Sequence, residues 1–178
     1  MSDLFDKITG NQDIFKKLAS KIPGFNGYIE RQNRRAADKV LRETIASHFE
    51  ELYKKVSALQ EDFISQGEIL YVDDLEKAAI KIRTFIDRIK TASYGYSGFF
   101  DAMKINEDEL KQVYEYDLSM VELEDEVSRA IENVEASMGS DGLQAAIRNL
   151  IKKAAECVEI FNKRDEVITK ANDSALTE

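Results

Sequence analysis

Residues 29–66 read IERQNRRAADKVLRETIASHFEELYKKVSALQEDFISQ and contain neither glycine nor proline. Apolar side chains recur along this segment in steps of three and four residues, at Ala37, Leu41, Ile45, Phe49, Leu52, Val56, Leu59 and Phe63. This spacing follows the 3.6-residue period of an α-helix and aligns the apolar side chains along one face. The sequence therefore predicts one long amphipathic helix over residues 29–66.

Glycine and proline divide the rest of the chain into further helices. The 178 residues contain eight glycines and one proline, in five clusters at 10, 23–27, 67, 95–98 and 139–142. Because glycine costs about 1 kcal/mol and proline about 3 kcal/mol inside a helix, these clusters mark helix ends. So few breakers also argue against a β-sandwich, which needs a turn roughly every 8–12 residues.

The segments between these clusters predict one short and three more long helices. The short helix covers residues 11–20, and the long ones begin near 73, 106 and 143 and end near 92, 138 and 172. Short links after Gln66 and Met138 favour antiparallel neighbours. We therefore predict a single all-α domain over residues 1–178, an up-down bundle of four long helices with the short N-terminal helix across one end.

The predicted lengths of the first two long helices differ. At 1.5 Å per residue they span roughly 57 and 30 Å. Either the loops at 67–72 and 93–105 cover the difference, or the first helix projects and pairs with a second copy of the chain, which would form a homodimer.

Composition excludes several classes of site. A single cysteine and a single histidine exclude a disulfide framework, a cysteine-rich zinc or iron–sulfur site and a two-histidine metal site within one chain. No nucleophile elbow, phosphate loop or Glu-x-x-His pair is present, so we predict no cofactor and no catalytic residue, and an enzyme is disfavoured. Structural roles are predicted for His48 at the edge of the apolar face, for Cys157 on a buried face and for Asp117 as acceptor of a tyrosine hydrogen bond.

The negative charge is concentrated in one part of the chain. The net charge is −9, and residues 101–141 hold 13 acidic and 3 basic residues. We interpret this acidic helix as a solvated face; the alternatives are a docking face for a basic partner and a carboxylate site for Mg²⁺ or Ca²⁺ at Glu122 and Glu126. The balance disfavours nucleic acid and anionic membranes as partners. With no export signal and no apolar run of about 18 residues, a cytoplasmic location is expected.

Two loops rich in glycine and aromatic residues, 21–28 and 94–100, are expected at the same end of an up-down bundle. Three arginines follow the first loop, at the start of a helix where cations oppose the helix dipole. We therefore predict a binding surface at this end for a protein partner, for self-association, or for an acidic or anionic ligand. Its residues would be Phe25, Tyr28, Arg31, Arg34, Arg35, Tyr94, Tyr96, Phe99 and Phe100. In the alternative interpretation, the aromatic rings seal the end and the arginines pair with Asp101, Glu107 or Asp108.

Residues 22–28 (IPGFNGY) and 97–101 (SGFFD), together with Glu30, Arg34, Arg35, Asp38 and residues 41–43 (LRE), resemble a pattern found in uncharacterised bacterial helical proteins. The resemblance implies that the two loops are recurring features, and it implies no activity. The favoured function is a non-enzymatic protein-interaction or scaffold module, and the alternative is a helical bundle that binds a metal or a small ligand.

Overall fold

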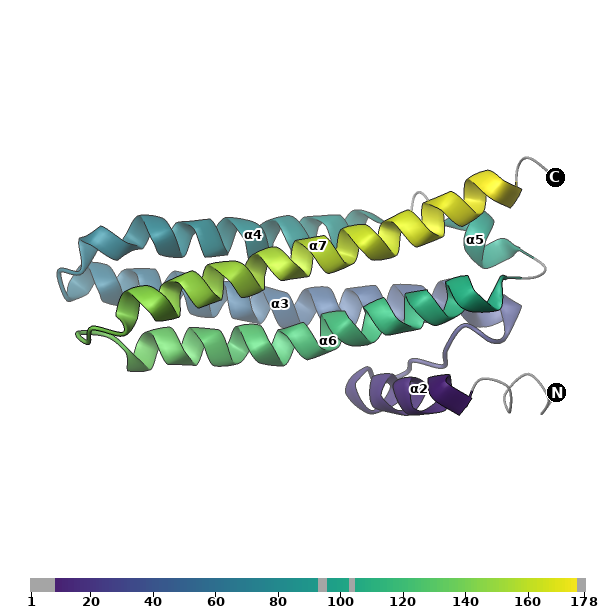
Figure 1. Ribbon diagram of the computed structural model, residues 1–178, viewed down its shortest axis with the longest axis horizontal. Coiled ribbons are helices and arrows are strands. Elements are labelled where there is room, and N and C mark those ends of the chain that lie inside the picture. The colour runs from purple at the N-terminus through teal and green to yellow at the C-terminus, as the bar shows by residue number, and fades with distance from the viewer. Residues whose placement is uncertain (1–8, 93–95, 103–104, 176–178) are drawn as a thin grey trace.

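The computed structural model describes residues 9–92, 96–102 and 105–175, and the regular structure in these ranges is entirely helical (Figure 1). Four helices are long: α3 (Arg34–Ser65), α4 (Val72–Thr91), α6 (Glu107–Ala136) and α7 (Leu143–Ala175). Two are short, α2 (Thr9–Lys21) and α5 (Ser97–Asp101), and the 3₁₀ turns η1 (Arg31–Asn33) and η2 (Ile69–Tyr71) precede α3 and α4. The prediction of an all-α bundle is confirmed.

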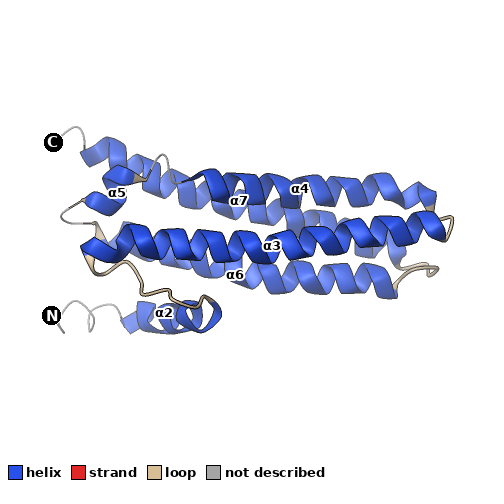
Figure 2. Cartoon of the chain, turned by 180° about the vertical axis from the view of Figure 1, so that it is seen from behind, coloured by secondary structure: helices blue, strands red, loops and turns tan. Residues whose placement is uncertain are grey.

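The four long helices form two antiparallel hairpins, α3 with α4 and α6 with α7, which pack side by side (Figures 1 and 2). Helix α3 lies next to α6, and α4 lies next to α7. Chain direction alternates from each long helix to the next, as predicted, but the pairs between hairpins are parallel. The connection from α4 to α6 therefore crosses the bundle diagonally, whereas in a plain up-down succession α4 and α6 would be neighbours.

Helix α5 forms part of this diagonal connection, in a segment predicted to be a loop. It packs against α3 and α7 beyond the end of α4 (Figure 1). Helix α3 has 32 residues and α4 has 20, which correspond to about 48 and 30 Å. Because α5 covers the additional length, the N-terminal part of α3 does not project without a partner.

Helix α2 lies along the side of α6 rather than across the end of the bundle (Figure 2). Leu18 and Ile22 lie one turn apart, and both are fully buried. The Lys21 ammonium is 3.1 Å from the Asp125 carboxylate on α6. The prediction of α2 across the end is therefore wrong in its placement, because the apolar face of α2 is covered by the flank of α6.

The core follows the predicted apolar faces. All eight apolar positions predicted in α3 are buried. The rings of Phe49 on α3 and Phe85 on α4 lie 4.5 Å apart between centroids, and Phe161 on α7 packs edge-on against Phe85. Among the described residues, no helix has both the length and the apolar character needed to cross a membrane.

Candidate interaction surface at the aromatic end

The loop before α3 and the segment around α5 meet at one end of the bundle, which we call the aromatic end (residues 22–35 and 96–102). The rings of Tyr28 and Phe100 lie 5.4 Å apart between centroids. The Arg31 Nε donates to the main-chain oxygen of Asp101 over 2.9 Å. The prediction that these two segments are neighbours is confirmed.

The aromatic side chains of this end belong to the core. Residues Phe25, Tyr28, Tyr96, Phe99 and Phe100 are all buried, and Tyr94 lies outside the described residues. Tyr28 contacts Phe25 edge-on, with centroids 5.4 Å apart, and lies 5.0 Å from the ring of Tyr114 on α6. The five described rings therefore seal the bundle, as in the alternative interpretation, and they offer no open apolar surface. A partner-binding role for them stays a prediction.

Beneath these rings lies a buried network of charged side chains. The Arg164 Nε of α7 donates to Asp117 of α6 over 2.5 Å, and its Nη2 donates to Asp38 of α3 over 2.8 Å. The Tyr28 hydroxyl donates to the other oxygen of Asp117 over 2.7 Å. Asp38 also pairs with Arg42 over 2.8 Å, and the Arg42 Nη1 donates to the Ile89 carbonyl near the end of α4. The predicted tyrosine hydrogen bond to Asp117 is confirmed, with Tyr28 as the donor.

Burial and the neighbouring charges shift the pKa values of this network in opposite directions. Burial raises the pKa of Asp117, and the Arg164 guanidinium and the Tyr28 hydroxyl act against that shift. Burial alone would lower the pKa of Arg164, but the carboxylates of Asp117 and Asp38 outweigh it and raise that pKa well above its ordinary value. Two carboxylates and two guanidiniums balance in charge, which reduces the desolvation cost of a buried cluster. The network is thus suited to holding α3, α6 and α7 together.

The three predicted arginines connect the two segments of the aromatic end. Arg34 is buried, and it donates to the main-chain oxygens of Tyr28 and Ala102 over 2.7 and 3.0 Å. Burial lowers the pKa of Arg34, and the neighbouring Arg31 charge adds to this shift. Arg35 forms an ion pair with the Asp101 carboxylate, as the alternative interpretation predicted. Arg34 therefore acts as a structural clamp, whereas Arg31 and Arg35 remain exposed.

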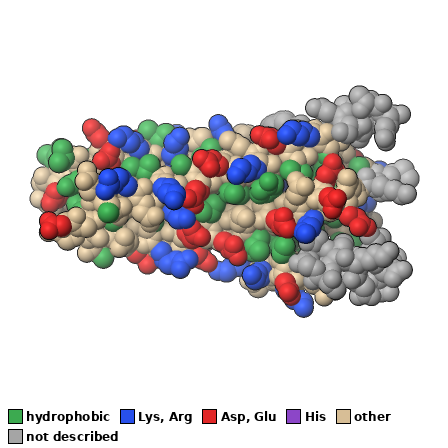
Figure 3. Space-filling model, in the orientation of Figure 1, with side chains coloured by type: hydrophobic (Ala, Val, Ile, Leu, Met, Phe, Trp, Pro, Cys, Tyr) green, Lys and Arg blue, Asp and Glu red, His purple; other side chains and the backbone are tan. Residues whose placement is uncertain are grey.

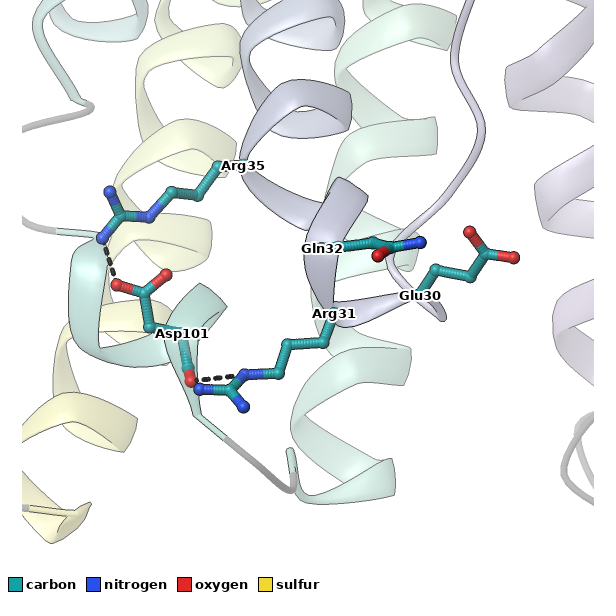
Figure 4. A pocket seen from close by; sticks show the side chains of 5 residues that line it. All are labelled: Glu30, Arg31, Gln32, Arg35 and Asp101. Carbon is teal, nitrogen blue, oxygen red and sulfur yellow. Dashed lines mark hydrogen bonds and ion pairs between the residues drawn. The ribbon is translucent and has the colours of Figure 1, made fainter.

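A groove of about 650 Å³ opens between the start of α3 and the end of α5 (Figure 4). It is lined by Glu30, Arg31, Gln32, Arg35 and Asp101. The side chains of Arg35 and Asp101 are 57% and 55% exposed. In the close-up, the two arginines reach Asp101 from either side, while Glu30 and Gln32 lie on the other flank. We call this feature the arginine groove.

His48 and Cys157, which were also predicted to have structural roles, lie outside the aromatic end. The His48 Nδ1 lies 2.8 Å from a carboxylate oxygen of Glu124, and Cys157 is buried. Burial, with the Glu156 carboxylate adding to it, raises the pKa of the Cys157 thiol to about 12. The described residues contain no group of three or more His, Cys, Asp or Glu side chains arranged to hold a metal ion.

Comparisons of the chain with models of protein families, with curated proteins and with solved structures find no match.

Proposed function

We propose that the chain is a protein-interaction module and that its binding surface is the arginine groove. The observation that supports this proposal best is the exposure of Arg31 and Arg35 on a fixed frame. Each guanidinium uses one N–H on Asp101, and a guanidinium carries five. Donors therefore remain for a bidentate bond to a carboxylate of the partner.

The arrangement favours an acidic segment as the partner. Both arginines are held by Asp101 at the end of α5, so little side-chain freedom is lost when a ligand enters. Glu30 on the opposite flank lies in the same groove, and it would select partners that place a basic or neutral group there. The buried aromatic residues contribute by keeping this frame rigid.

The test is the double substitution Arg31→Glu/Arg35→Glu, compared with Lys81→Glu/Arg83→Glu on α4. Both pairs are exposed and change the net charge equally. Each purified protein is used to capture partners from a cell extract, and captured proteins are identified by mass spectrometry. Partners held by the parent and the α4 variant but absent from the groove variant support the proposal. The same set on all three proteins contradicts it, provided that circular dichroism shows each variant to be folded.

A further inference from the structure

The end of the bundle opposite the aromatic end exposes three large aliphatic side chains around the turn between α3 and α4. Ile64 is 55% exposed, Ile69 67% and Leu70 82%. Single exposed aliphatic residues are ordinary on a protein surface, but three within seven residues of one turn are not. Figure 3 shows apolar side chains at this end of the molecule, on the left. We call these three residues the apolar tip.

The backbone of this turn is held firmly. Gly67 has a φ of +81°, and the amides of Gly67 and Glu68 donate to the carbonyls of Ile64 and Phe63 over 3.1 and 2.9 Å. These two bonds and the positive φ form a Schellman motif, which ends α3 sharply. The ring of Tyr71 then packs edge-on against Phe63, which is fully buried. The apolar tip is therefore presented on an ordered turn, and its exposure does not come from a frayed helix end.

The chain segment that carries the apolar tip is acidic over residues 60–76. Residues 60–76 contain six acidic residues and neither lysine nor arginine: Glu61, Asp62, Glu68, Asp73, Asp74 and Glu76. Among the described residues, only Asp74 of these six has an ion pair, with Lys77 at 2.6 Å. An anionic lipid surface would be repelled by this rim, and two copies meeting tip to tip would bring like charges together. A basic partner with apolar side chains would be attracted by the acidic residues and would bury the exposed aliphatic side chains.

We propose that the apolar tip is a docking site for a protein segment that carries aliphatic or aromatic side chains flanked by lysine or arginine. The apolar side chains of that segment cover Ile69 and Leu70, and its cations pair with Glu68 and Asp73. This site lies at the other end of the bundle from the arginine groove and does not depend on it.

The experiment uses the purified full chain to select binders from a display library of random short peptides. An enriched peptide is then synthesised with a fluorophore, and its affinity is measured by anisotropy. We expect enriched sequences to combine apolar residues with lysine or arginine. Ile69→Ser/Leu70→Ser should weaken binding by about tenfold or more, whereas Ile80→Ser, a 53% exposed isoleucine on α4, should leave it unchanged. Glu68→Lys/Asp73→Lys and added salt should both weaken it.

Other outcomes overturn the proposal. Enriched peptides that lack basic residues, peptides that bind the tip variant as well as the parent, or no enrichment at all would each do so. A dimer seen by sedimentation and abolished by Ile69→Ser/Leu70→Ser would identify a second copy as the occupant. Binding of the parent, but not of that variant, to phosphatidylglycerol vesicles would identify a membrane. Because both substituted side chains are exposed, the variant retains the core, and thermal melting verifies that it is folded.

Discussion

Asp117 is fully buried beneath the aromatic end and accepts hydrogen bonds from two elements distant in sequence, Arg164 of α7 and Tyr28 of the loop before α3. Neither the carboxylate nor the guanidinium is exposed. Such a pair stabilises a fold weakly compared with apolar residues of the same shape, yet the loss of one partner leaves the other charge buried and unpaired. The integrity of the network matters more than the strength of any one bond.

We expect Asp117→Asn to lower the free energy of unfolding by about 3–5 kcal/mol, because Arg164 then keeps only Asp38 as an ionised partner. Chemical denaturation followed by circular dichroism measures the change. Asp73→Asn, an exposed carboxylate at the start of α4, serves as the control and should change stability by about 0.5 kcal/mol or less. A loss below about 1 kcal/mol for Asp117→Asn would show that the network carries little stability.

Cys157 provides a second test, based on reactivity. Since burial and the Glu156 carboxylate raise its pKa to about 12, the native protein should react with iodoacetamide far more slowly than the chain in urea, where a thiol titrates near pH 8.5. Mass spectrometry of the alkylated protein gives both rates. Equal rates in the two states would mean that the thiol is accessible in the fold.

The sequence predicted some of these residues and missed others, for a physical reason. The burial of Cys157, a partner for the His48 ring nitrogen and the tyrosine hydrogen bond of Asp117 were predicted correctly, because the positions of these residues relative to the apolar faces were visible. The burial of Arg164 was not predicted, although this residue follows Phe161 by three residues and precedes Ile168 by four, and so occupies the buried face of α7. A charge at such a position signals a buried partner, but the sequence does not identify that partner, because it comes from another helix.

At the scale of the elements, two glycines in the connections have positive φ but differ in the space around them. One allows the cost of backbone strain to be measured alone, and the other adds the cost of a steric clash. Gly27 has a φ of +76° and Gly67 a φ of +81°. A Cβ at position 67 would meet nothing within 4 Å, whereas a Cβ at position 27 would lie 2.8 Å from the Tyr114 Oη and 3.0 Å from the Phe15 ring. The Tyr114 hydroxyl also accepts the Tyr28 amide over 2.7 Å, so this contact has little room to move.

We expect Gly67→Ala to cost about 1–2 kcal/mol, the price of a left-handed conformation for an L-residue. Gly27→Ala should cost more, because it adds a clash with Tyr114 and strains a buried hydrogen bond. Urea denaturation of the two variants in parallel measures the difference. Equal losses would mean that the loop before α3 relaxes without disturbing Tyr114.

The long helices were predictable from the sequence, and their connections were less so. Helix α6 begins where expected, with the Asn106 side chain accepting the amide of Asp108 over 2.9 Å and three acidic residues in the first turn. Residues 97–101 fall almost entirely in the segment 94–100, which was predicted as a loop because it contains Gly95 and Gly98. Their helix forms because Phe99 and Phe100 are buried at the end of the bundle, and such tertiary packing overrides local propensity. The same holds for α2, whose placement depends on the flank of α6.

For the molecule as a whole, buried tyrosines predict a loss of stability at alkaline pH. Burial raises the pKa of Tyr28, Tyr96 and Tyr114, the last to about 12. Above about pH 10 these hydroxyls ionise in the unfolded chain but keep their protons in the fold, so each one lowers the free energy of unfolding by about 1.4 kcal/mol per pH unit.

Denaturation between about pH 9 and pH 11 measures this slope. Tyr114→Phe should reduce the loss across these two pH units by about 1.4 kcal/mol in total, because one proton fewer is linked to unfolding. That variant is less stable at every pH, since the Tyr28 amide loses its acceptor, but the slope does not depend on that offset. A free energy of unfolding that stays flat across this range would contradict the burial of the three hydroxyls.

The diagonal connection between α4 and α6 joins two hairpins that must align along their helix axes. Each hairpin brings its own neutral ion pair, Asp38 with Arg42 in the first and Asp117 with Arg164 in the second. The bond between Arg164 and Asp38 joins them. A slide of one helical turn, about 5.4 Å, would still match apolar face to apolar face, but it would break this bond between buried charges. Apolar faces therefore bring the hairpins together, and the buried bond between Arg164 and Asp38 distinguishes the correct alignment from one shifted by a turn.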